Sequence, residues 1–197
     1  RFVFHAETTD KLLVFGTNGR FYAVGVDKLP GGRGFGEPLR LMFDMPSDHD
    51  IAALQIFKPD RKLLVASSDG RGFVVMEKEV FAQTRAGKQV LNVSGSNEAK
   101  VCVSADGDSV AVIGENRKLL IFDAAELPEM TRGRGVILQR YKDGGLSDAV
   151  VFNQADGLQW KSGERTRTET QLRDWIGKRA QAGRLPPKGF PRNNRFS

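Results

Sequence analysis

The stretch KLLVFGTNGR at residues 11–20 decides the fold, because it returns as KLLVASSDGR at residues 62–71, an offset of 51 positions. A third copy is found at residues 110–118 and a fourth at residues 149–157. Each copy is a short apolar run, then a turn-forming pair or triplet, then another strand-like run. Asn18-Gly19 and Asp69-Gly70 predict tight hairpins in which both central residues have positive φ. The repeat therefore predicts a series of β-hairpins.

The segments that follow the hairpins repeat as well. A Gly-containing basic segment recurs in each unit, at residues 31–39, 84–91, 131–137 and 182–186. A further strand is predicted to open each unit at Phe2–Phe4, 51–57 and 101–103, whereas the fourth unit is expected to lack its opening strand. The spacing of Leu172, Trp175 and Ile176 permits one helical turn.

These patterns predict an all-β fold built from four-stranded repeats of roughly 50 residues. Such a sheet is too small to bury its own face, so neighbouring sheets must stack, and a radial array of them is a propeller. We expect one domain with about four repeats, the last of them incomplete. Their approximate bounds are 1–46, 47–95, 96–141 and 142–187, with a basic tail at 188–197.

Composition excludes several classes of protein. With 40% hydrophobic and 27% charged residues, the 197-residue chain fits neither a disordered protein nor a membrane protein, and its apolar runs are too short to span a bilayer. One cysteine and two histidines exclude a disulfide scaffold and argue against a metal centre, and they fit a reducing cytoplasm. No export leader is visible, and the start at Arg1 suggests a piece of a longer protein.

The positive charge is concentrated at one end of the chain. Residues 1–160 hold 20 basic and 21 acidic residues, whereas residues 161–197 hold 10 basic and 3 acidic residues. The whole surplus of +6 therefore lies in the last 37 residues. Such a block can bind polyanions, although a basic terminus is often only solvated.

Residues that could carry catalysis have simpler explanations. Tyr22 aligns with Phe73, Leu120 and Trp160 in the other repeats, which is typical of a core position. Cys102 lies in an apolar strand and is interpreted as a small buried hydrophobe. The two histidines have no matching partners, and the glycine-rich segment at 31–36 fits neither a dinucleotide fingerprint nor a phosphate loop. We expect no catalytic residue, no metal and no cofactor in this chain.

Arginines recur beside glycines at similar positions of successive units. These are Arg33, Arg85, Arg132, Arg134 and Arg184. If the units surround an axis, these side chains fall on one rim, where arginine supplies a forked donor to phosphate and glycine permits close backbone approach. The alternative is that these segments are merely solvated turns.

Together, several of these motifs resemble the C-terminal domain of bacterial type IIA topoisomerase A subunits. The resemblance covers essentially the whole chain. It rests on Gly19-Arg20, Leu29-Pro30, residues 32–39, residues 131–136 and the LPPKGFP run at 185–191. It implies a β-pinwheel, a propeller-like ring whose blades exchange a strand and which binds and bends duplex DNA on a basic outer rim.

The resemblance also assigns residues and partners. The expected DNA contacts are Arg20, Arg33, Arg71, Arg85, Lys88, Arg117, Lys118, Arg132, Arg134, Arg140, Arg184 and Lys188. The implied partners are double-stranded DNA, the breakage-reunion part of the same polypeptide and a separate ATPase subunit, with no membrane. ATP, Mg²⁺ and the catalytic tyrosine would belong to the rest of the holoenzyme, which is expected in the bacterial cytoplasm on the chromosome.

Within this family the sequence favours the topoisomerase IV branch. Gyrase A subunits carry a box of one glutamine, two arginines, two glycines, a lysine and a glycine, and no stretch here matches it. Residues 33–36 and 132–135 are degenerate versions. The gyrase branch is the alternative, and a propeller that serves only as a protein scaffold is a second one.

Overall fold

The computed structural model describes residues 2–197, which form three β-sheets and a separate hairpin. The first sheet has the order β3-β1-β2-β6, with β1 (Lys11–Gly16), β2 (Arg20–Gly25), β3 (Ile51–Ile56) and β6 (Lys88–Gln89). The second has the order β10-β5-β4-β7, with β4 (Lys62–Ser67), β5 (Arg71–Met76), β7 (Ala99–Ser104) and β10 (Val136–Ile137). The third has the order β11-β8-β9, with β8 (Ser109–Gly114), β9 (Leu119–Asp123) and β11 (Leu146–Phe152). The final hairpin pairs β12 (Leu158–Ser162) with β13 (Arg165–Glu169).

Helical residues are confined to short segments between strands. These are α1 (Glu77–Val80), η1 (Val26–Lys28), η2 (Leu39–Met42), η3 (Ala124–Glu126) and η4 (Gln154–Asp156). Among residues 2–197 no helix is long and apolar enough to cross a membrane. The predicted all-β class with four-stranded sheets is confirmed.

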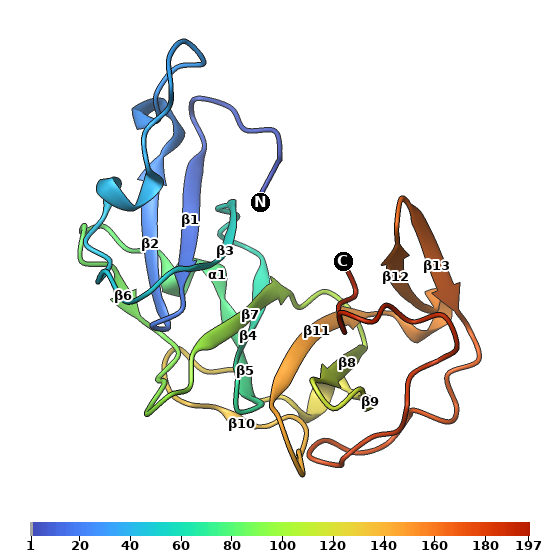
Figure 1. The fold of residues 1–197 in the computed structure, drawn as a ribbon. Helices are drawn as coiled ribbons and strands as arrows, with labels where there is room; N and C mark the ends of the chain where they lie inside the picture. Colours follow the sequence, from blue (N-terminus) through green and yellow to red (C-terminus); the bar gives the residue numbers. More distant parts are fainter. Residues whose placement is uncertain (1) are drawn as a thin grey trace.

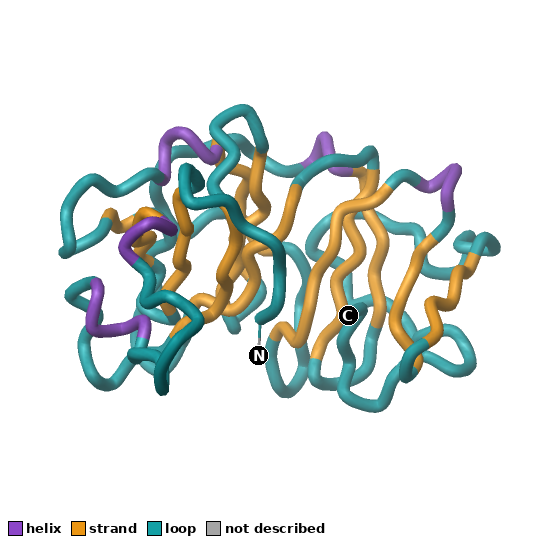
Figure 2. Tube along the Cα trace, turned by 90° about the horizontal axis from the view of Figure 1, so that it is seen from above, coloured by secondary structure: helices purple, strands orange, loops and turns teal. Residues whose placement is uncertain are grey.

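The sheets follow one another around an incomplete ring (Figure 1). Seen from above, they stand face to face in a row, with loops and short helices at the strand ends (Figure 2). Strands β3, β7 and β11 form the inner edges of the three sheets, and β7 contacts both β3 and β11. Strands β2, β5 and β9 therefore face outward. The outer rim is defined here as these three strands and the segments that pair with them.

Each sheet takes two strands from the unit that follows it. The hairpin β1–β2 receives β3 on its inner edge and β6 on its outer edge, and the hairpin β4–β5 receives β7 and β10 in the same way. In the third sheet β11 pairs with β8, and Leu119 of β9 pairs with Arg184. This exchange of strands is the arrangement that the resemblance implied, and it crosses the repeat bounds expected from the sequence.

The hairpin turns differ from the prediction. Gly19 and Gly70 have φ of +79° and +81°, but the preceding Asn18 and Asp69 do not have positive φ. Instead, the amide N–H of each glycine donates to a carbonyl three residues earlier, and the Asn18 side chain accepts from the Arg20 N–H. In the third hairpin the glycine position is held by Arg117 with φ of +62°, a conformation that disfavours a side chain.

The fourth unit was misaligned by the sequence pattern. The apolar run at residues 149–152 is part of β11, the opening strand that was expected to be missing, and the hairpin of this unit is β12–β13. Trp160 therefore lies on the first strand of its hairpin and does not match Tyr22. One smaller prediction is wrong as well, because Phe2–Phe4 is not a strand. Where the spacing permitted a helical turn, residues 173–175 form a turn in which the Trp175 N–H donates to the Leu172 carbonyl.

The core consists of apolar layers between successive sheets. Leu13 and Phe15 of the first sheet meet Leu63 and Val65 of the second, and equivalent layers lie between the second and third sheets and between the third sheet and the final hairpin. A buried ion pair locks the second unit, since Arg61 Nε lies 2.5 Å from Glu77 Oε2 and the Lys58 amide donates to the same carboxylate. Removing one partner would leave a buried charge unpaired, which typically costs about 3–5 kcal/mol.

Candidate nucleic-acid interface

Three of the four glycine-containing segments lie on the outer rim, whereas the first, at residues 31–39, pairs with no strand in the described chain. Gly87, Gly135 and Gly183 each have φ between +71° and +81°, and each is followed by residues that pair with the outer strand of the preceding sheet. A Cβ atom at these glycines would collide with the carbonyl of Phe21, Gly72 or Leu119. The glycines are thus explained by close approach to a strand.

Three predicted contacts share one position at the start of the outer strands. Arg20 opens β2, Arg71 opens β5, and Lys118 immediately precedes β9. Because the strands are equivalent, these cations lie at matching points along the rim.

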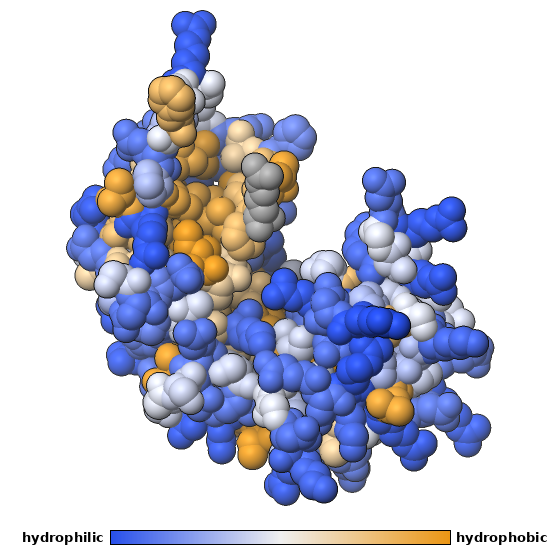
Figure 3. All heavy atoms as spheres, viewed as in Figure 1, coloured by the Kyte–Doolittle hydropathy of each residue, from blue (hydrophilic) through white to orange (hydrophobic). Residues whose placement is uncertain are grey.

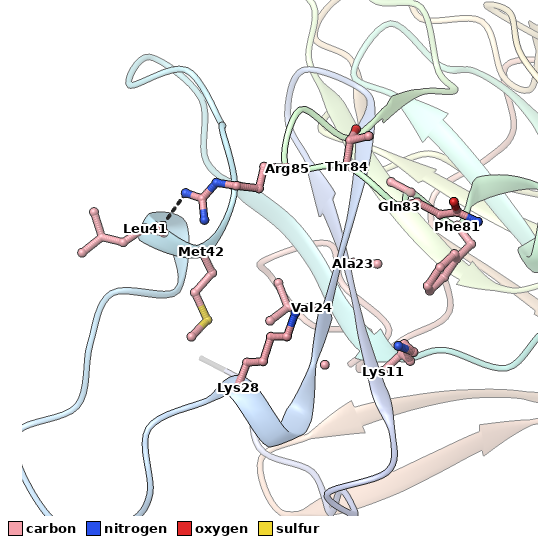
Figure 4. A pocket seen from close by; sticks show the side chains of 12 residues that line it. Lys11, Ala23, Val24, Lys28, Leu41, Met42, Phe81, Gln83, Thr84 and Arg85 are labelled. Carbon is pink, nitrogen blue, oxygen red and sulfur yellow. Dashed lines mark hydrogen bonds between the residues drawn. The ribbon is translucent and has the colours of Figure 1, made fainter.

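Several of the predicted cations are committed to contacts within the chain. Arg20 donates to the carbonyls of Ala86 and Gly87 at 3.0 and 3.2 Å. Arg85 donates to the Leu41 carbonyl at 2.9 Å beside a cavity of about 660 Å³ (Figure 4) and lies 3.4 Å from Asp44. The Lys88 ammonium donates to the Glu79 carbonyl. Such groups would give up or share a partner to bind phosphate.

A carboxylate divides the charge on the second sheet. Asp69 Oδ2 lies 3.9 Å from Arg71 Nε and 3.5 Å from Arg134 Nη2. Both arginines are at least one-third exposed, so the two ion pairs are weak and the net charge of the three groups is +1. This point of the rim is less positive than the sequence suggested.

Arg117 holds the end of the chain. Its guanidinium donates to the Pro191 carbonyl and to the Asn194 side chain, both at 2.9 Å, and to the Phe190 carbonyl at 3.3 Å. The tail continues along β12, where the Lys161 N–H donates to the Phe196 carbonyl at 2.8 Å. The last residues are therefore part of the final unit and do not form a loose basic tail.

The other predicted cations are exposed and have no side-chain partner among residues 2–197. They are Arg33, Lys118, Arg132, Arg140, Arg184 and Lys188. Gln139 brings three of them together, because its buried amide donates to the carbonyls of Lys118 and Ala182 at 2.8 and 2.9 Å. Next to it, the Arg140 N–H donates to the Gln181 carbonyl, and Arg184 pairs with Leu119. We call Lys118, Arg140 and Arg184 the Gln139 cluster.

The last unit extends this positive surface with residues that the predicted set left out. Arg165, Arg167, Arg173, Lys178, Arg192 and Arg195 are all exposed, and none has a side-chain partner in the described chain. Hydrophilic residues cover this part of the molecule in Figure 3. The signal that could have found them is the block of positive charge in residues 161–197.

The residues with possible catalytic chemistry are placed as structural groups. Tyr22 is fully buried, with its hydroxyl 3.0 Å from Asn18 Nδ2. Burial raises the pKa of the Cys102 thiol, which disfavours the reactive thiolate. His49 Nδ1 contacts the Thr17 hydroxyl. Across residues 2–197 no group of three or more potential metal ligands is present.

Comparison with known proteins agrees with this architecture. The family model described as "DNA gyrase C-terminal domain, beta-propeller" matches residues 61–97 and 108–152. The chain is 47% identical to the A subunit of DNA topoisomerase 4 from Rickettsia bellii and 50% identical to that from Caulobacter vibrioides, over 100% and 99% of its length. It spans 27% and 26% of those two proteins.

A solved structure shows the same fold. The chain superposes on the E. coli ParC C-terminal domain with a TM-score of 0.79 and 25% identity. The match covers 95% of this chain and 80% of that domain.

Proposed function

Because the chain belongs to the family of C-terminal propeller domains of topoisomerase IV and gyrase A subunits, we propose that it is the DNA-binding C-terminal domain of a topoisomerase IV A subunit. The topoisomerase IV assignment is supported by the 47% and 50% identical relatives and by the missing gyrase box. The gyrase branch remains the alternative.

The observation that carries DNA binding is the continuity of unpartnered cations from the outer rim into the last unit. The Gln139 cluster lies beside the outer strand of the third sheet, and Lys188 and Arg192 follow in the tail that Arg117 holds. Arg132 lies in the segment that leads into β10 of the second sheet. These groups meet phosphates on the outside of a duplex. Since they project from rim segments without any recognition helix, they bind the backbone and do not read bases.

The role that follows is to hold a DNA segment beside the breakage-reunion part of the same polypeptide. The domain steers the capture of a second duplex and bends it modestly, so that the holoenzyme decatenates and relaxes DNA on the bacterial chromosome. Cleavage and ATP hydrolysis with Mg²⁺ take place elsewhere in the holoenzyme, which includes a separate ATPase subunit. The isolated chain neither cuts DNA nor hydrolyses ATP.

The experiment is a gel shift on linear duplexes of unrelated sequence at several salt concentrations. About five phosphate contacts give a log–log slope of affinity against salt near −4 to −5, with equal affinity for all sequences. The absence of binding at low salt would support the protein-scaffold alternative. A strong preference for one sequence would contradict recognition through the backbone.

A further inference from the structure

The outer edge of the first sheet is open at Ala23. This residue has in β2 the position that Val74 has in β5 and Ile121 has in β9. Val74 exchanges two backbone hydrogen bonds with residues 128–130, at 3.0 and 2.8 Å, and Ile121 does so with residues 175–177, at 2.9 and 2.8 Å. Outside its pairing with β1, Ala23 makes no hydrogen bond within residues 2–197. Its outward N–H and C=O groups are therefore available to another strand.

Residues 81–83 are the segment that would close this edge. The Thr-Arg pair at residues 84–85 aligns with the pair at residues 131–132, so residues 81–83 are equivalent to residues 128–130. The groups that correspond to the bonded ones are the Phe81 carbonyl and the Gln83 N–H. Within the described chain, neither of these two groups forms a hydrogen bond. Both sides of the gap thus lack the pairing that the later units have.

Both ends of this segment are anchored to other parts of the chain. The Phe81 ring packs on the Phe57 ring, with the two centroids 4.8 Å apart. At the other end the Arg85 guanidinium donates to the Leu41 carbonyl at 2.9 Å, and the Asp44 N–H donates to the Arg85 carbonyl at 2.8 Å. The segment is thus fixed beside the open edge of β2 without pairing with it.

The cavity of about 660 Å³ lies along this open edge, lined by Ala23, by residues 81–85 and by residues 41–42 (Figure 4). Ligand pockets typically have volumes of about 300–1,000 Å³. Asp44 balances the charge of Arg85 at 3.4 Å, whereas the two lysines of the cavity have no ion-pair partner among residues 2–197. The lining is partly apolar, and its charged residues are all cations, namely Lys11, Lys28 and Arg85. The cavity therefore suits a ligand that has both apolar and acidic groups.

The second unit indicates which residue type fits opposite Lys11. Lys62 opens β4 as Lys11 opens β1, and its ammonium lies 2.8 Å from Glu129 Oε2. Glu129 is the middle residue of the segment that pairs with Val74. Its equivalent at the open edge is Ala82, so residues 81–83 offer Lys11 no carboxylate. A strand that filled the gap would complete both interactions if it carried an acidic residue at its centre.

We propose that the open edge at Ala23 binds a short, extended, acidic peptide of a separate partner protein, in the way that residues 128–130 bind β5. The peptide lies parallel to β2, exchanges two backbone hydrogen bonds with Ala23 and places a carboxylate at Lys11. Backbone bonds to a sheet edge supply affinity, and the adjoining side chains supply specificity. A peptide fits better than DNA, because a phosphate accepts from the Ala23 N–H but has no donor for the Ala23 carbonyl. This site does not depend on the proposed DNA binding.

The test is an NMR titration of the 197-residue chain with a synthetic peptide that has the sequence of residues 126–131 and blocked ends. The Ala23 amide is expected to shift saturably, whereas the Val74 amide, whose edge is already paired, is expected to stay in place. A peptide with Gln in place of Glu129 should bind about two- to fivefold more weakly. N-methylation of Met130 in the peptide, which removes a backbone donor, should weaken binding at least about threefold. No saturable shift at Ala23, or equal affinity of all three peptides, would overturn the proposal.

A pair of matched variants sharpens this test. Lys11 and Lys62 are both exposed at the start of an equivalent strand, so Lys11→Gln and Lys62→Gln remove the same charge without disturbing the core. Lys11→Gln is expected to weaken binding of the acidic peptide about two- to fivefold and to abolish its advantage over the Gln peptide. Lys62→Gln is expected to leave both affinities unchanged, because Lys62 already has Glu129 as its partner. An equal loss in the two variants would contradict the site.

Two other occupants of the edge have distinct signatures. Displacement of the peptide by a linear DNA duplex, together with an equal loss of duplex and peptide affinity in Lys11→Gln, would assign the cavity to the DNA path. Slow hydrogen exchange of the Ala23 and Gln83 amides in the peptide-free chain would show that residues 81–83 close the edge themselves. Either result would overturn the proposal.

Discussion

The Arg117 guanidinium donates a hydrogen bond of 2.9 Å to the Pro191 carbonyl, across 74 residues of sequence. The same residue holds a left-handed backbone conformation that glycine takes in the first two hairpins. The side chain thus compensates for an unfavourable backbone by fixing the last segment of the chain against the third hairpin.

Arg117→Ala is expected to release this segment. It removes three hydrogen bonds to the tail and keeps the unfavourable φ, so we expect a loss of about 1–3 kcal/mol in the stability of the final unit and faster amide exchange in residues 190–196. Lys118→Ala is the control, because that exposed side chain has no partner among residues 2–197. Unchanged exchange of the tail in Arg117→Ala would contradict the clamp.

Charge reversal at Arg132 and Arg134 is expected to weaken DNA binding equally for all sequences. The loss of two phosphate contacts would flatten the log–log salt slope by about 2. The matched control is Lys28→Glu/Lys78→Glu, which changes the charge by the same amount at exposed positions after the outer strands. Unchanged affinity in the arginine variant would move the interface to the last unit.

Asp148 is expected to make stability depend on pH in the acid range. Burial raises the pKa of this carboxyl, although N–H donors of Phe196 and Ala149 partly oppose the rise. With its pKa higher in the folded than in the unfolded state, the folded protein gains stability as pH falls through that pKa, and the ionised group costs stability above it.

Asp148→Asn is therefore expected to be at least as stable as the parent at pH 7. Its unfolding free energy should also vary less between about pH 4 and neutrality than that of the parent. Urea denaturation at several pH values measures this dependence. Asp143→Asn, at an exposed position, is the control. A variant that is less stable at pH 7 would show that the hydrogen bonds outweigh the cost of burial.

The domain is expected to bend DNA without wrapping it fully. Bending a site of 20–30 base pairs by 40–90° costs on the order of 1–6 kcal/mol, so a full wrap needs continuous contacts. Asp69 and the internal contacts of Arg20 and Arg85 interrupt the rim. After ligation of nicked circular DNA in the presence of the domain, the linking number should stay close to that of free DNA. A large stoichiometric shift would favour the gyrase alternative.

The hairpins and rim segments could be predicted because they depend on local signals. Positive φ angles, which favour glycine, occur at Gly19, at Gly70 and at the glycines that precede the rim segments. The third hairpin has Arg117 instead of glycine at this position, and Arg117 is stabilised by acceptors in the tail more than 70 positions away. Sequence patterns do not report a side chain's distant partners, so Arg117 was expected on DNA.

The last unit was misread for a related reason. A hairpin with both faces buried has two apolar strands, whereas β12 alternates Leu158 and Trp160 with polar residues and β13 is polar throughout. The apolar run of β11, from Ala149 to Phe152, resembled a hairpin strand more closely than the true one did. The amphipathic pattern that hid this hairpin reflects its packing, with one face against the third sheet and the other exposed.

The regular strand exchange has an evolutionary consequence. The inner strands β3, β7 and β11 begin at Ile51, Ala99 and Leu146, which are nearly evenly spaced along the chain. Each unit therefore contributes its inner strand and its outer segment to the sheet of the hairpin before it. Duplication of one such interval would hand each new hairpin both of its flanking strands without altering existing pairs. Lineages that duplicate or delete such an interval would therefore gain or lose whole blades, and the curvature of the ring would change in whole steps.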